Sequence, residues 1–197
     1  MIENIATTTK IDWRIFLGSL NEIVISSQKK EKLESALTKF SSLALATLGD
    51  QNAHKKPGNL KSGEHQFSVA GFFMHMPKEE KSVLIAEKGF PVEQHRLSIP
   101  DSLGHPGWVV KNKKPLLLSN TDEHSDFKQI LKTARMGSAM YSPLFRKGSF
   151  IGQFITASQA RNTYNSDDHV LHQTMTSCAS AIFCRFGETE VLNTINN

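Results

Sequence analysis

The sequence predicts a mixed α/β (α+β) domain, with helices toward both ends of the chain and strands between them. Three observations support this fold class: helical spacing of apolar residues before residue 49, β-rich runs at 66–87 and 138–158, and a second helical pattern after 168. A chain of 197 residues is long enough for one such domain with an ordinary core and an appendage. We divide it into N-terminal helices (1–49), a flexible loop (50–65), a main domain (66–186) and a C-terminal tail (187–197).

Two amphipathic helices are predicted before the loop. Apolar residues recur every three or four positions in each, and Gly49 is placed to end the second. The first stripe consists of Trp13, Phe16, Leu17, Leu20 and Val24, and the second of Leu33, Leu37, Phe40 and Ala44. The segment 50–65 is polar and rich in glycine and proline, which is typical of a loop.

Two hairpins supply the predicted strands. The run 66–76 ends at Pro77 and pairs with 82–87, and 138–145 pairs with 150–158 across a glycine-containing turn. Shorter elements are predicted around them: a linking stretch at 92–100, a short helix at 106–112, a brief strand at 115–118, a short helix at 126–133 with Phe127, Ile130 and Leu131 turned inward, and a final helix at 168–186.

The composition argues against nucleic-acid and membrane partners. The net charge is +4, but lysines and arginines are scattered among acidic residues, whereas a nucleic-acid site needs a clustered basic face. No apolar run approaches the ~20 residues of a membrane span, and the first ten residues lack the pattern of a secretory signal. The sequence therefore predicts a cytoplasmic protein.

The cysteines also fit a reducing compartment. Cys178 and Cys184 lie six residues apart in one predicted helix, where they point about 120° from each other. They are therefore not expected to form a disulfide with each other.

Five fragments between 103 and 168 occur in an order and at a spacing that resemble those of a known family. They are LGHPGWVV (103–110), KPLLL (114–118), RMGSAMYSPLF (135–145), GSFIGQF (148–154) and YNSDD (164–168). The third and fourth form the most specific signature: a strand, a proline where pairing ends, a glycine turn and a glycine at the start of the return strand. Together they resemble the GAF domain, a small α/β sensor module of phytochromes, phosphodiesterases and bacterial signalling proteins.

The resemblance implies a six-stranded antiparallel sheet sandwiched by helices, with the N-terminal helices packed beside the C-terminal one. It also implies a pocket beneath the loops and short helices of the opposite face. In this family the pocket holds cyclic nucleotides, bilins, haem, nitrate or amino acids, or has no known ligand, so the cofactor stays unidentified.

Nine residues are predicted to line such a pocket because of their location alone. They follow the second strand, begin the central helix, flank the third strand or belong to the central strand, and the amides at a helix start suit an anion or carbonyl. These candidates are His95, Arg96, Ser98, Gly107, Trp108, Ser119, Phe127, Ser138 and Met140.

No catalytic or metal-binding constellation is evident in the sequence. His169 and His172 have a spacing that metal ligands use, but no further ligand cluster completes a site. Ser138, Ser142 and His124 lack the sequence context of a hydrolase. Bilin attachment and the methionine sulfoxide reductase branch of the family need cysteines near the pocket, and both cysteines lie instead on the final helix. We therefore predict no metal site and no enzyme.

The leading functional prediction is a stand-alone sensory or regulatory module that binds a small molecule and acts through a partner protein. The alternatives are an interaction or dimerisation module without a ligand and, less favoured, a reductase of the methionine sulfoxide type. Apolar stripes on three helices exceed what one sheet face can cover, so a homodimer through the terminal helices is predicted.

Overall fold

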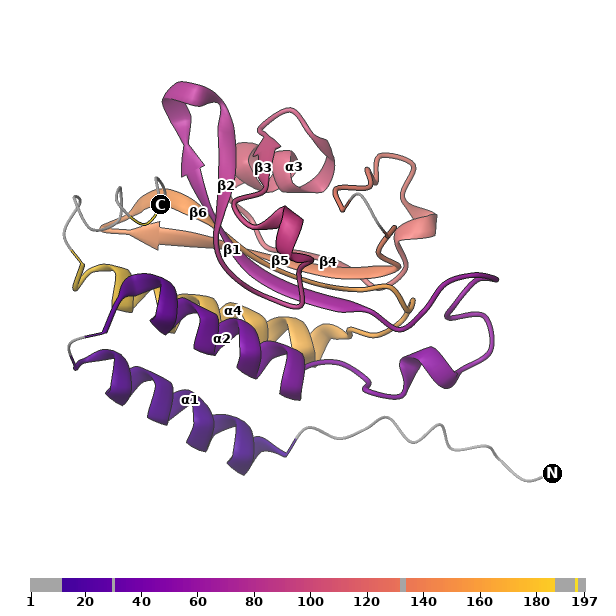
Figure 1. Ribbon diagram of the computed structural model, residues 1–197, viewed down its shortest axis with the longest axis horizontal. Coiled ribbons are helices and arrows are strands. Elements are labelled where there is room, and N and C mark those ends of the chain that lie inside the picture. Colours follow the sequence, from indigo (N-terminus) through magenta and orange to yellow (C-terminus); the bar gives the residue numbers. More distant parts are fainter. Residues whose placement is uncertain (1–11, 30, 132–133, 187–193, 195–197) are drawn as a thin grey trace.

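A six-stranded sheet forms the centre of the protein (Figure 1). The computed structural model describes residues 12–29, 31–131, 134–186 and 194. The strands run in the order β3-β2-β1-β6-β5-β4, and every neighbouring pair is antiparallel, which confirms the predicted sheet. Their bounds are β1 (Ser68–Met76), β2 (Lys81–Lys88), β3 (Ser98–Pro100), β4 (Leu116–Leu118), β5 (Ser138–Arg146) and β6 (Ser149–Ser158).

Helices cover both faces of this sheet. On one face α2 (Leu33–Thr47) and α4 (Ser166–Phe183) lie against the strands, and α1 (Trp13–Ser27) forms an outer layer on these two helices (Figure 1). The opposite face carries α3 (Gly104–Asn112), which contacts β5 and β6. The predicted packing of the N-terminal helices beside the C-terminal helix is thus confirmed. Among the described residues, no helix is long and apolar enough to cross a membrane.

Two separate cores result because side chains alternate between the faces of each strand. The helical-face core lies between the sheet and α1, α2 and α4; in it Phe72 stacks on Phe154 with ring centroids 4.2 Å apart, and Phe40 meets Phe72 edge-on. The α3-face core is smaller. It consists of Val69, Phe73, Leu84, Ile99, Val109, Leu118, Phe127, Leu131, Met136, Ala139, Tyr141, Ile155 and Ala157.

Two connecting segments differ from the prediction. The stretch 92–100 contains a 3-10 turn, Val92–Gln94, and the edge strand β3. The helix predicted at 126–133 does not form over its described residues 126–131, and a 3-10 turn lies earlier, at Thr121–Glu123. A helix this short is costly to nucleate, so tertiary contacts of its side chains decide the conformation. Phe127 and Leu131 are buried as predicted.

The segment 50–65 is anchored to the domain through Arg161. The guanidinium, of which 3% is exposed, pairs with Glu64 and, at 2.8 Å, with Asp122, and Lys61 reaches the same Asp122 carboxylate at 2.7 Å. Hydrogen bonds from Arg161 and Lys61 lower the pKa of Asp122 to about 2. Within the segment, Asn59 is buried and its side-chain amide donates to the Ala53 carbonyl. Two carboxylates from distant parts of the chain therefore share one buried cation.

Candidate functional site

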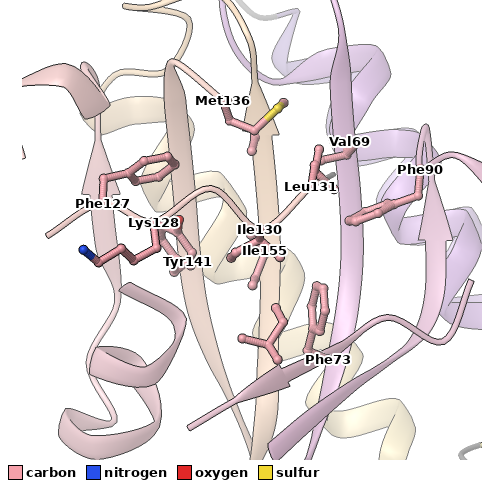
Figure 2. Close-up of a pocket in the computed structure, with 12 residues that line it drawn as sticks. Val69, Phe73, Phe90, Phe127, Lys128, Ile130, Leu131, Met136, Tyr141 and Ile155 are labelled. Carbon is pink, nitrogen blue, oxygen red and sulfur yellow. The ribbon is translucent and has the colours of Figure 1, made fainter. Parts of the chain in front are cut away.

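A cavity lies in the α3-face core, between the sheet and the segment that precedes β5 (Figure 2). Its volume is about 40 Å³. The empty space that also includes solvent at its open mouth is about 420 Å³. Its walls consist of Val69, Phe73, Phe90, Ile99, Phe127, Lys128, Ile130, Leu131, Met136, Tyr141, Ile155 and Ala157. We regard this cavity as the candidate ligand site.

The period of two along each strand explains which side chains form the floor. Val69 and Phe73 of β1, Tyr141 of β5, and Ile155 and Ala157 of β6 all point to the α3 face. The antiparallel register places them side by side, since Val69 pairs with Ala157 and Tyr141 with Ile155. The floor is therefore held by three central strands.

An irregular segment forms the roof. Phe127, Ile130 and Leu131 reach over the floor from the chain between β4 and β5, and Met136 closes one side (Figure 2). Phe127 is also held by Arg135, whose guanidinium carbon lies 4.8 Å from the centroid of its ring. The roof thus consists of side chains on a segment that has no helix or strand through residue 131.

The wall of the cavity has almost no polar groups. Tyr141 contributes a phenol, and burial raises its pKa well above the ordinary value, so it stays protonated. Lys128 is exposed, and Figure 2 shows its ammonium end turned away from Ile130 and Leu131. The lining can therefore offer apolar contact and one neutral hydroxyl-bearing ring.

A histidine lies behind this wall. The His105 ring of α3 lies 5.8 Å from Phe127 and 6.4 Å from Tyr141, and 5.6 Å from the His124 ring. Burial lowers the pKa of His105, the neighbouring His124 lowers it further, and Asp126 opposes the shift. Its Nδ1 is buried without a hydrogen-bond partner. His105 is therefore a neutral ring at pH 7 that backs two lining aromatics.

Among the nine candidates named from the sequence, Phe127 lines this cavity. Ser138 and Ser119 instead tie backbone together, since their hydroxyls donate to the carbonyls of Leu118 (3.1 Å) and Tyr164 (3.2 Å). Met140 belongs to the helical-face core, on the far side of the sheet. The side chain of its neighbour Tyr141 points to the opposite face of β5 and lines the cavity.

The candidates after the second strand lie outside the cavity. His95 is exposed and meets Glu87 at 2.5 Å, and Ser98 is exposed on the edge strand β3. Arg96 turns toward α2, where its guanidinium donates to the Ile85 carbonyl (2.8 Å) and to Glu34 (3.0 Å). These three side chains therefore do not converge with Phe127.

The two candidates on α3 also point elsewhere. Gly107 packs against backbone, since a Cβ there would lie 2.2 Å from the Asp101 carbonyl oxygen, so close approach of α3 to that loop requires glycine. Trp108 is 40% exposed. Floor residues such as Val69, Ile155 and Ala157 were missed, because both faces of their strands are buried and the sequence does not show which face borders the cavity.

Other groups considered from the sequence lie on the opposite face. His172 is buried, with its ring nitrogens 2.7 Å from the Ser142 hydroxyl and 3.0 Å from that of Thr156. Cys178 and Cys184 are free thiols on and just after α4, the first half-buried and the second exposed. Neither cysteine lines the cavity. The described residues contain no group of three or more His, Cys, Asp or Glu side chains that could hold a metal ion.

The comparison with family models identifies the family to which this fold belongs. The model described as GAF domain matches residues 63–182, more than half of the chain. The chain belongs to the GAF domain family. Among curated proteins no sequence matches it.

Solved GAF structures share this fold at low sequence identity. The GAF domain of an Acinetobacter phosphoenolpyruvate-protein phosphotransferase is similar with a TM-score of 0.67 and 16% identity, covering 87% of this chain and 93% of that one. A putative GAF sensor protein from Burkholderia vietnamiensis is similar with a TM-score of 0.62 and 13% identity, covering 91% and 97%. The fold thus supports a ligand-binding or regulatory module.

Enzymes also appear among the structural neighbours. The free methionine-R-sulfoxide reductase of Neisseria meningitidis, solved with its substrate, is similar with a TM-score of 0.65 and 16% identity, covering 87% of this chain and 91% of that one. The prediction that the chain is not an enzyme is therefore wrong as an inference from this fold. That prediction relied on the lack of a catalytic motif in the sequence, whereas the same fold carries out catalysis in this neighbour.

Proposed function

We propose that this GAF domain is a sensory module that binds a small molecule in the α3-face cavity and signals through a partner protein. The observation that carries the proposal is the cavity itself, a hollow with an open mouth over the central strands of the sheet. Concave sites with mostly apolar walls are the usual form of small-molecule sites. The roof segment and α3 would respond to occupancy, because Phe127 contacts both the cavity and His105 of α3.

The output of such a module would leave through the terminal helices. α4 contacts β5, the strand that carries Tyr141, and α1 lies on α4 and α2. A shift of β5 caused by a ligand would therefore be felt at the outer helical layer. We further propose that the protein acts in the cytoplasm and pairs as a homodimer through this layer, where α1 exposes Trp13, Ile15, Leu17 and Ile25.

The first experiment measures whether the cavity retains a ligand. Native mass spectrometry of freshly purified protein, followed by a thermal-shift screen of small metabolites, would be run on wild type, Ala157→Val and Val170→Ala. Ala157 is 5% exposed at the cavity floor, so added methyl groups fill the site, whereas Val170 is 58% exposed on α4. We expect a retained mass or a thermal shift in wild type and Val170→Ala, and its loss in Ala157→Val. A compound that stabilises all three proteins equally would contradict binding in this cavity.

Catalysis is tested with wild type and a double variant of the two cysteines. Purified wild type would be incubated with free methionine-R-sulfoxide and a dithiol reductant, and methionine formation would be followed over time. Turnover that survives Cys178→Ser with Cys184→Ser would proceed without a thiol of the protein, because these are the two cysteines of the chain. Turnover that disappears in this double variant would assign it to those thiols and would replace the sensory proposal.

A further inference from the structure

The walls of the α3-face cavity indicate which chemical class of ligand it can accept. Apart from Lys128, every lining residue presents an aliphatic, thioether or aromatic side chain. The exposed Lys128 turns its ammonium end outward (Figure 2). A charged group inside this cavity would lose its hydration without gaining a counter-charge, which is strongly unfavourable.

The arginines around the site are already engaged. Arg135 lies over the Phe127 ring and 3.6 Å from Asp122. Arg161 is paired with Glu64 and Asp122, and Arg96 is bound to Glu34 on the helical face. None of these three arginines lines the cavity, and neither does the N-terminal turn of α3. Apart from the exposed Lys128 and the neutral Tyr141 phenol, a phosphate or carboxylate inside the cavity would therefore find no donor of the kind that such groups require.

We propose that the cavity binds an uncharged, apolar ligand, such as a short aliphatic chain or a small aromatic ring, and excludes phosphate esters, carboxylates and zwitterions. This inference rests on the proposed function, because it names the ligand class of the same site. Phe73 and Phe127 supply aromatic faces, and the flexible Met136 adapts to the shape of the guest.

The size of the cavity specifies how such a ligand enters. An apolar cavity that holds benzene measures about 150 Å³, whereas this one measures about 40 Å³. The floor is held by paired strands, so the additional space comes from the roof. Ile130 and Leu131 lie on a segment without regular structure, and their outward movement enlarges the site without breaking the sheet.

The test uses three probes of equal chain length on the full chain: hexanol, hexanoate and hexylammonium. Binding would be measured by titration of methyl signals in protein labelled at methionine and isoleucine methyl groups, so that Met136 and Ile130 report from the wall. We expect hexanol to bind at least ten-fold more tightly than either ion. Leu131→Ala should strengthen binding of the longer octanol, Ala157→Val should weaken hexanol binding, and Val170→Ala should leave both unchanged.

The outcomes separate this inference from the proposed function. Equal or tighter binding of hexanoate or hexylammonium at Met136 and Ile130 would overturn the exclusion of charge while leaving a small-molecule site in place. A charged metabolite retained in native mass spectrometry and lost in Ala157→Val would do the same. If no probe perturbs these methyl groups and no metabolite is retained, both the ligand class and the sensory proposal fail.

Discussion

The ionisation of His172 is closely tied to folding. Its ring lies parallel to that of Phe154 with centroids 4.4 Å apart, and its nitrogens meet the hydroxyls of Ser142 and Thr156. Burial lowers the pKa of His172 to about 3, with a further contribution from His169. The imidazole is therefore neutral in the folded protein, and Ser142 and Thr156 satisfy it without a charge.

This burial predicts an acid-dependent loss of stability. Because the pKa of His172 is lower in the folded state than the ordinary histidine value of 6.5, the unfolded state binds more protons between pH 6.5 and 3. The free energy of unfolding should therefore fall as the pH falls through this window, by about 1 kcal/mol per pH unit from this residue. Urea unfolding of wild type and His172→Gln at pH 7, 6 and 5 measures the effect.

The comparison cancels the other titrating groups, which both proteins share. His172→Gln should be less stable at pH 7, because packing on Phe154 is lost, but its stability should vary less with pH. Parallel pH profiles for the two proteins would show that His172 is not the group responsible.

Sequence reasoning at the residue scale found Phe127 of the cavity and missed its floor. It placed Met140 in the pocket, yet Met140 and Tyr141 point to opposite faces of β5 and Tyr141 lines the cavity. A strand that is buried on both faces presents no polar alternation, so its apolar pattern does not reveal which face meets the helices. Packing against α2 and α4 decides which face of β5 meets the helices, and the periodicity of the sequence carries no information about that packing.

At the scale of elements, regular structure was predicted well where the sequence is strongly periodic. The three long helices and both hairpins have clear apolar patterns, and all were found. β3 was missed because Ser98–Pro100 has one apolar residue, Ile99, between a serine and a proline, whereas β4, which is equally short, is a run of three leucines and was predicted. The segment 126–131 was taken for a helix because its apolar residues have helical spacing, whereas contacts of Phe127 with Arg135 and His105 hold it in an irregular form.

The anchoring of the segment 50–65 gives a prediction at this scale. Replacing Arg161 with Met should leave Glu64 and Asp122 without their shared buried cation and cost about 3 kcal/mol of stability. Hydrogen exchange should become faster at the backbone amides of residues 59–64, because the Arg161 guanidinium also donates to the Asn59 carbonyl and this bond is lost with the substitution. Urea unfolding and exchange mass spectrometry measure the two effects.

Arg14→Met is the matched control, since Arg14 is exposed on α1. It should change stability by less than about 0.5 kcal/mol and leave exchange unaltered. If Arg161→Met protects residues 59–64 as well as wild type does, the segment is held by other contacts, such as the bond from the Asp50 amide to the Thr163 carbonyl.

At the scale of the whole molecule, the outer helix α1 determines which surface is left for a partner. Phe16 and Leu20, which sequence analysis assigned to a surplus apolar surface, are 0% and 6% exposed and belong to the helical-face core. Charged substitutions there would unfold the protein rather than separate two copies. The exposed apolar residues of α1 are instead Trp13, Ile15, Leu17 and Ile25.

Two of these residues, Trp13 and Leu17, share a side of α1 with a groove that lies between α1 and α4. At ~100° per residue, Leu17 and Val24 lie within about 40° of Trp13 around α1, whereas Ile15 lies about 160° from Leu17. Val24 lines the groove together with Cys178 and Ile182 of α4. Trp13 and Leu17 thus lie on the same side of α1 as this groove, and we call this side of α1 with the groove the α1–α4 strip. Exposed apolar surface of this kind usually marks an interface.

The last prediction tests the proposed homodimer with two substitutions on one helix. Leu17→Glu places a charge on the α1–α4 strip and should convert the dimer to a monomer in light scattering, with an unchanged far-ultraviolet spectrum because Leu17 is 53% exposed. Ile15→Glu adds the same charge on the other side of α1, where 62% of the residue is exposed, and should leave the dimer intact. Dissociation by both variants would indicate a general charge effect rather than a contact at the strip. A wild-type protein that is monomeric at high micromolar concentration would refute the dimer.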